Sequence, residues 1–144
     1  MAKFLLEAEF DYDFDLLGLV SPLRDYRLCW LINKKLNVDF HRRNDLEINL
    51  IQQQKLTYFS IYSYYDSLDK ASFFILNNKN NNDLLIPEMK QVDYFFMTKG
   101  NIALQERDRL LISLKEVQAI QTLFEVNPLS LKSRQNLIFD ESDI

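Results

Sequence analysis

Residues 92–97 read Val-Asp-Tyr-Phe-Phe-Met, an apolar run of strand length interrupted by a single charge. A strand that is apolar on both faces must be covered on both faces, so this run predicts a central strand of a layered sheet. The rest of the chain must therefore supply elements that cover both sides of that strand.

Apolar residues at three- and four-residue spacing predict two helices, each with one buried face. The first runs from residue 23 to about 36, and Ser21-Pro22 predicts its start, with the serine as N-cap and the proline at the first helical position. The second opens at Gly100 or Asn101 and runs to about residue 114. The apolar positions are Leu28, Leu31, Ile32 and Leu36 in the first helix and Leu104, Leu111 and Leu114 in the second.

Alternating or apolar runs predict the remaining strands. These are residues 3–10 with a continuation to 16, then 38–42, 46–51, 56–65, 72–76 and 117–126. The polar segment 77–83 has no apolar anchor and predicts a mobile hairpin loop. Pro128 ends the last strand, and the tail from about residue 128 is expected to be irregular.

The order strand, helix, several strands, helix, strand predicts an α+β fold. We expect a single domain over residues 1–144, with a mostly antiparallel sheet of about five or six strands and two helices. The arrangement resembles a split β-α-β plan with extra strands in the middle.

Composition excludes several classes of function. Gly18 and Gly100 are the only glycines, so no glycine-rich phosphate loop can form. The net charge of −4 lowers the expectation of nucleic-acid binding. The single cysteine, Cys29, cannot form an internal disulfide and favours a reducing compartment. Acidic residues interrupt any signal-peptide core and no run is long enough to span a bilayer, so a cytoplasmic protein without membrane contact is expected.

Residues 86–94 read Ile-Pro-Glu-Met-Lys-Gln-Val-Asp-Tyr. This string resembles the signature of the IPExxxVDY family of Bacteroidetes-type bacterial proteins, and it matches all six fixed positions. Residues 14–18, 25–30 and 132–139 also resemble that family. The resemblance implies a short protein without an assigned activity, and it transfers no catalytic or binding residues.

Glu88 and Asp93 are the carboxylates of this string. They are five residues apart, which places them on opposite faces of an extended chain, so they form an acid–base pair only if the segment bends. We expect Glu88 to accept backbone or arginine hydrogen bonds at the strand entrance. Asp93 lies in an apolar run and needs a partner if buried, for which Arg24 and Arg27 are candidates.

Metal and nucleophile patterns are weak. The series Asp11, Asp13, Asp15 suggests a calcium-binding loop. Counted from Asp11, such a loop needs glycine at its sixth position and glutamate at its twelfth, but this chain has Leu16 and Pro22 there. A solvated acidic strand is therefore favoured. His41 and Cys29 are each alone in the sequence, and zinc spacing is missing. We therefore expect no metal, no cofactor and no catalytic residues, and an inert buried thiol at Cys29.

Two groups of residues are candidates for binding. Tyr58, Tyr62 and Tyr64 would share one face of a strand over 56–65, covered most readily by a helix, next by a partner or second copy, and least by RNA bases. A basic stretch could contact an anion, an acidic partner or a nucleic acid, but a helix end followed by a solvated edge strand is favoured. That stretch consists of Lys34, Lys35, His41, Arg42 and Arg43.

Three functional hypotheses follow. The first is a non-enzymatic protein-binding or adaptor module that acts on a protein partner or as a homodimer. The second is an RNA-associated accessory factor that uses the basic stretch. The weakest is an enzyme in which Glu88 and Asp93 converge in a carboxylate-lined pocket.

Overall fold

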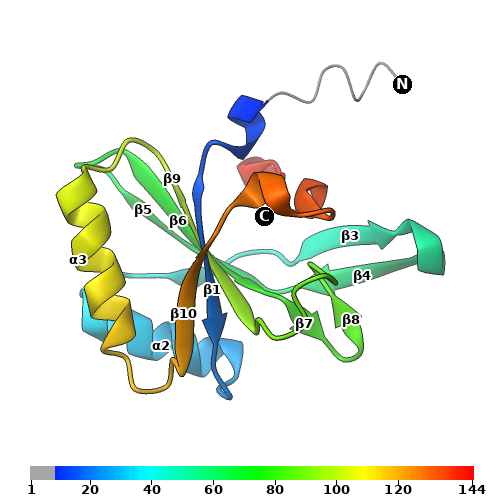
Figure 1. Cartoon of the computed structure of the whole chain (residues 1–144), viewed down its shortest axis with the longest axis horizontal. Coiled ribbons are helices and arrows are strands. Elements are labelled where there is room, and N and C mark those ends of the chain that lie inside the picture. Colours follow the sequence, from blue (N-terminus) through cyan, green and yellow to red (C-terminus); the bar gives the residue numbers. More distant parts are fainter. Residues whose placement is uncertain (1–8) are drawn as a thin grey trace.

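The computed structural model describes residues 9–144 (Figure 1). The strand predicted at 3–10 lies almost wholly outside the described residues, and Glu9–Tyr12 at its end form the short 3₁₀ helix η1. Past η1, Asp13 is exposed and Phe14 is buried, but the first strand begins only at Asp15.

The main sheet has six strands in the order β10-β1-β9-β6-β5-β2, and every neighbouring pair is antiparallel. Their bounds are β1 Asp15–Val20, β2 His41–Arg42, β5 Ile61–Asp66, β6 Ala71–Asn77, β9 Tyr94–Lys99 and β10 Thr122–Val126. Two separate hairpins pair β3 Leu46–Leu50 with β4 Lys55–Phe59 and β7 Lys79–Asn80 with β8 Asp83–Leu84. The remaining elements are helices α2 Asp25–Leu36 and α3 Leu104–Lys115 and the 3₁₀ turns η2 Ile51–Gln53, η3 Pro128–Ser130, η4 Arg134–Leu137 and η5 Glu141–Asp143.

The sheet contains a split β-α-β unit. Strands β9 and β10 lie on either side of β1 and are both antiparallel to it, so they are parallel to each other. Helix α3 connects them. The predicted α+β fold, with a mainly antiparallel six-stranded sheet and two helices, is therefore confirmed.

One face of the sheet, here called the helix face, lies under α2 and α3 (Figure 1). It presents Leu17, Leu19, Tyr62, Ile75, Tyr94 and Phe96 to the helices. Leu28, Cys29 and Ile32 of α2 and Leu114 of α3 are buried against it. The apolar spacing that predicted the two helices therefore marks their contact with the sheet.

The opposite face, here called the loop face, lies under no α-helix among residues 9–144. It presents Leu16, Ile61, Phe74, Leu76, Phe95 and Met97. The β3–β4 hairpin, the loop before β9 and the C-terminal segment 128–144 cover it (Figure 1). That segment has only 3₁₀ turns, yet Leu131, Leu137 and Ile144 are buried in this core.

Several predicted boundaries are wrong for identifiable reasons. Helix α2 begins at Asp25 rather than at Ser21-Pro22, because the Ser21 backbone N–H donates to the Asp93 carboxylate and its hydroxyl accepts from the Leu23 N–H. The predicted strand 56–65 is two strands in different sheets, with a break at Ser60. In the first case a contact with a distant segment, the Asp93 carboxylate, overrides the local helix signal.

The other differences concern strand length. Strand β9 starts at Tyr94, because Val92 closes a turn with its N–H donating to the Met89 carbonyl. The predicted strand 117–126 is a strand only over Thr122–Val126, since residues 117–120 form turns that bury Val117 and Ile120 on the helix face. The predicted strand 38–42 is reduced to His41–Arg42.

Candidate functional site

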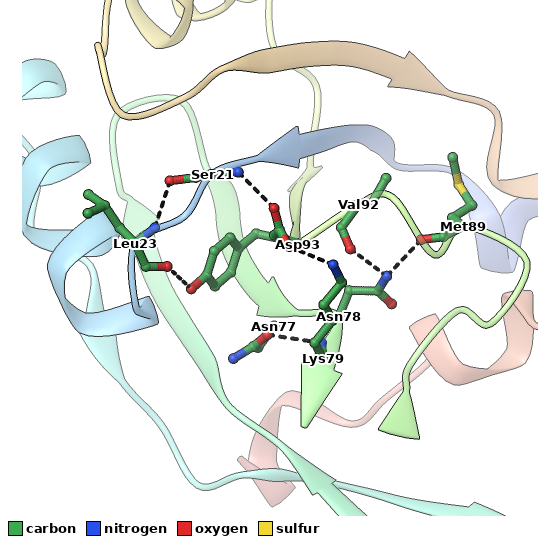
Figure 2. A network of polar contacts seen from close by, with 9 residues as sticks. Ser21, Leu23, Asn77, Asn78, Lys79, Met89, Val92 and Asp93 are labelled. Carbon is green, nitrogen blue, oxygen red and sulfur yellow. Dashed lines mark hydrogen bonds and ion pairs between the residues drawn. The ribbon is translucent and has the colours of Figure 1, made fainter. Parts of the chain in front are cut away.

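The string at 86–94 wraps around a buried asparagine, Asn78 (Figure 2). The Asn78 side-chain amide donates to the carbonyls of Met89 and Val92 at 3.0 and 2.8 Å. Its side-chain oxygen accepts from the Ile86 N–H at 2.8 Å. Because every hydrogen-bonding group of the Asn78 side chain is paired, its burial leaves no polar group without a partner. The buried amide therefore stabilises the loop that it binds. The segment predicted as a hairpin loop does contain the β7–β8 hairpin, but Asn78 near its start is a fully buried anchor.

Asp93 joins this loop to two other parts of the chain. One carboxylate oxygen accepts from the Ser21 N–H at 2.9 Å, and the other is 2.8 Å from the Lys79 ammonium (Figure 2). The expected partners Arg24 and Arg27 are not the ones found, because β9 places Asp93 beside the end of β1 and the start of β7. The carboxylate is therefore used within the fold.

Glu88 is also held within the chain. It accepts from the Ser133 N–H at 2.6 Å and from the Ser133 hydroxyl at 2.8 Å, so the expected backbone bond is present. Partial burial raises the pKa of Glu88, but hydrogen bonds from Ser133 together with the backbone groups of Glu88 and Lys132 outweigh burial and hold that pKa below its usual value. Glu88 binds the C-terminal segment while Asp93 binds β1 and β7, so the structure assigns the two carboxylates to separate contacts.

The three tyrosines do not form one row. Tyr62 and Tyr64 lie on the helix face, where Tyr62 is buried against α2 and burial raises its pKa to about 12. Tyr58 belongs to the β3–β4 hairpin and is half exposed, with its hydroxyl 3.4 Å from Glu47. The expected helical cover is correct for Tyr62 and Tyr64, and the shared face is wrong because the strand breaks at Ser60.

The basic stretch is largely occupied by internal contacts. Arg42 pairs with Asp45 at 2.9 Å, and Arg43 donates to the Ser63 hydroxyl and to the backbone oxygen of Ile144. In α2, Lys35 pairs with Glu116 at 3.0 Å, and the Lys34 ammonium lies 4.5 Å from the Trp30 ring centre. His41 and Arg42 form the short outer strand β2, which matches the favoured interpretation as a helix end followed by an edge strand.

Groups that could perform chemistry are not clustered. Burial, with smaller contributions from Asp25 and Asp39, raises the pKa of the Cys29 thiol to about 12, which suppresses the reactive thiolate. Among residues 9–144 no group of three or more histidine, cysteine or acidic side chains could hold a metal ion. Within the same range no helix is long and apolar enough to cross a bilayer.

The two edges of the main sheet differ, and sequence reasoning missed this difference. One edge is β2, which has two residues, both exposed and capable of positive charge. The other edge is β10, here called the open edge, with the sequence Thr122-Leu-Phe-Glu-Val126. In the described part of the chain β10 pairs only with β1. The available signal was a mostly apolar strand without lysine or proline inside it.

A shallow groove adjoins the segment that leads into the open edge. Val117, Gln118 and Ala119 form one wall. Trp30 and Leu31 of α2, with Leu23 just before that helix, form the other. Trp30 is 56% exposed, which is high for so large an apolar group. Arg27 and Lys34 line the same groove and give it a positive charge.

No family model matches the chain, and no curated protein matches it. The candidate site therefore rests on the open edge and the groove themselves.

Proposed function

We propose that this protein is a non-enzymatic protein-binding module that adds an extended segment of a partner protein to the open edge of its sheet. The observation that carries the proposal is a five-residue outer strand with no strand paired to its outer side in the described chain. Such an edge offers a row of backbone donors and acceptors to a second chain.

The contrast with the other edge supports this proposal. Natural sheets block their edges with very short strands, charged side chains, proline or bulges. Strand β2 has two of these devices, a length of two residues and the exposed side chains of His41 and Arg42. The open edge has one charge, Glu125, which faces Arg107 at 3.5 Å, and Pro128 follows only after the strand has ended. The open edge is thus suited to pairing.

The groove beside Trp30 supplies side-chain contacts to such a partner. Backbone pairing gives affinity with little selectivity, whereas pockets for individual side chains give specificity. Trp30 and Leu31 would contact an apolar side chain, and Arg27 would favour an acidic residue near it. The partner expected is therefore an extended segment with both apolar and acidic residues.

The other hypotheses have less support and stay predictions. RNA binding through the basic stretch is weakened by the pairing of Arg42 with Asp45 and of Arg43 with Ser63 and Ile144. An enzyme based on Glu88 and Asp93 is weakened because both carboxylates bind other parts of the fold.

Membership in the IPExxxVDY family, bacterial origin and a cytoplasmic location are also proposals. The family proposal is supported by the physical roles of its fixed residues here. Ile86 is fully buried, Glu88 and Asp93 each bind a distant segment, and the Tyr94 hydroxyl donates to the Leu23 carbonyl at 2.6 Å. The cytoplasmic proposal is supported by the single cysteine, which is free and buried.

The test is affinity purification of the tagged full chain from its own cells, with and without nuclease, in two edge variants. Thr122→Lys and Thr122→Glu each add a charge to the open edge, one of either sign, at an exposed side chain. His41→Lys at the opposite edge is the matched control. We expect one dominant protein that survives nuclease, is lost from both Thr122 variants and is retained by His41→Lys.

Other outcomes discriminate among the hypotheses. Retention of the partner by both Thr122 variants would contradict pairing at the open edge. Loss of all partners on nuclease treatment would favour the RNA hypothesis. If the only protein recovered is the chain itself, light scattering of the purified protein distinguishes a homodimer that pairs edge to edge from a monomer.

A further inference from the structure

A cavity of about 250 Å³ lies between the helix face, α2 and α3, away from the open edge. Its wall contains Phe40, Tyr64, Phe73 and Phe96, which come from the strands and from the segment after α2. Its rim carries Lys35, Asp66, Asp69, Glu106 and Arg109. We call it the aromatic cavity, and the contacts described above for the open edge do not use it.

The four rings contact one another in a closed cycle. Ring centres are 5.8 Å apart for Phe40 and Tyr64, 5.9 Å for Tyr64 and Phe73, 6.3 Å for Phe73 and Phe96, and 5.7 Å for Phe96 and Phe40. Phe40 and Phe96 are buried, whereas Tyr64 and Phe73 are partly exposed. Packed rings of this kind lose little freedom on binding, and the electron-rich faces of aromatic rings attract cations.

The charges on the rim favour a positive ligand. Lys35 is paired with Glu116 at 3.0 Å and Arg109 with Glu106 at 2.9 Å, so both cations are neutralised. Asp66 accepts only the backbone N–H groups of Leu68 and Asp69. Neither Asp66 nor Asp69 has a cationic partner among residues 9–144. Two uncompensated carboxylates therefore remain beside an aromatic wall.

We propose that the aromatic cavity binds a small organic ammonium ion, with its alkyl groups against the rings and its charge toward Asp66 and Asp69. The size of the cavity limits the ligand. At about 30 Å³ per water, 250 Å³ corresponds to roughly eight water volumes, which is room for a choline-sized ion but not for a drug-sized molecule. A free organic ammonium ion such as choline and the methylated side chain of a lysine in another protein present the same chemistry.

The test is a titration of the ¹⁵N-labelled full chain followed by amide chemical shifts. Choline is the charged probe, and 3,3-dimethyl-1-butanol is its uncharged isostere. We expect choline to shift amides of residues that line the aromatic cavity and to bind about tenfold more tightly than the isostere. Asp66→Asn with Asp69→Asn should weaken choline binding about tenfold, while Asp11→Asn with Asp13→Asn, an exposed acidic pair elsewhere, should leave it unchanged.

A further variant isolates the rings, and a second arm identifies the source of the ligand. Phe73→Leu keeps an apolar wall but removes one ring, and it should weaken choline more than the isostere. A short peptide with trimethyllysine that binds more tightly than choline assigns the site to a protein side chain, and the reverse order assigns it to a free ion. Equal binding of choline and its isostere, or no shift in the lining residues with any probe, would overturn the proposal.

Discussion

The two faces of the sheet are covered in different ways. The helix face lies under two helices whose apolar residues repeat at helical spacing, and its core is almost wholly apolar. The loop face lies under the β3–β4 hairpin, a loop and a C-terminal segment, and the last two have little regular structure. Both cores contain fully buried side chains, for example Leu28 on the first and Ile86 on the second.

The difference lies in what holds each cover in place. On the helix face, the backbone groups of the cover are hydrogen-bonded inside the helices. Side-chain packing alone can therefore hold these helices against the sheet. On the loop face, irregular backbone needs partners, which side chains supply. Asn78 binds the loop before β9, Glu88 binds Ser133, Asn136 donates to the Leu85 carbonyl, and Arg43 donates to Ile144. Irregular covers thus depend on a few polar residues, whereas helical covers depend on many apolar ones.

The largest expected effect is therefore at Asn78. Asn78→Leu has the same branched side-chain shape but leaves the Val92 carbonyl and the Ile86 N–H without their partner, and it leaves the Met89 carbonyl with the Val92 N–H alone. We expect the free energy of unfolding, measured in urea, to fall by about 4 kcal/mol or more. The control is Asn82→Leu in the same polar segment, where the residue is exposed and the expected change is within about 0.5 kcal/mol. A small effect at Asn78 would show that the loop face is held by apolar packing after all.

The next effect tests the helix face. Leu28→Ala removes a fully buried side chain of α2 and should lower the free energy of unfolding by about 3 kcal/mol, through lost burial and the cavity left behind. Leu104→Ala on α3, where the side chain is 68% exposed, is the matched control and should change stability by about 0.5 kcal/mol or less. Similar losses at the two positions would contradict the assigned contact faces.

A smaller, pH-dependent effect is expected at Glu88. Glu88→Gln weakens the charge-assisted bonds from Ser133 and should cost about 0.5–1 kcal/mol at neutral pH, since the side chain is largely solvent-exposed. Because the pKa of Glu88 is lowered in the folded state, its contribution is present above the unfolded pKa and disappears as pH falls through the folded value. Urea unfolding at several pH values should show the variant and the parent converging in acid. A difference that persists unchanged in acid would argue against this role, and Glu47→Gln is the control.

The last test leaves the sequence unchanged and uses Cys29 as a probe of the helix face. With its pKa raised from 9.0 to about 12, the buried thiol has about a thousandfold less thiolate than a free cysteine at pH 8. We expect almost no reaction with a thiol reagent in the native state and rapid reaction in urea. Fast labelling in native conditions would mean that α2 opens readily from the sheet.

Part of this fold could be predicted because the signals were local. The two helices, the buried core of β9 and the α+β class follow from apolar spacing, which a helix or strand imposes on its own residues. The backbone bond to Glu88 followed from the cost of leaving a carboxylate unpaired. In contrast, the partners of Asp93 were wrong and the tyrosine row broke at Ser60, because both depend on where distant segments meet.

The sequence by itself therefore determined the two helices with their apolar faces, the buried strand β9 and the absence of a glycine-rich phosphate loop, since these depend on neighbouring residues and on residue type. Only the tertiary structure decided the strand order that leaves β10 at an edge, the burial of Asn78 and the packing of four rings in the wall of the aromatic cavity. Those features arise from contacts between segments far apart in the chain. Residue spacing carries no information about which of those segments will be neighbours.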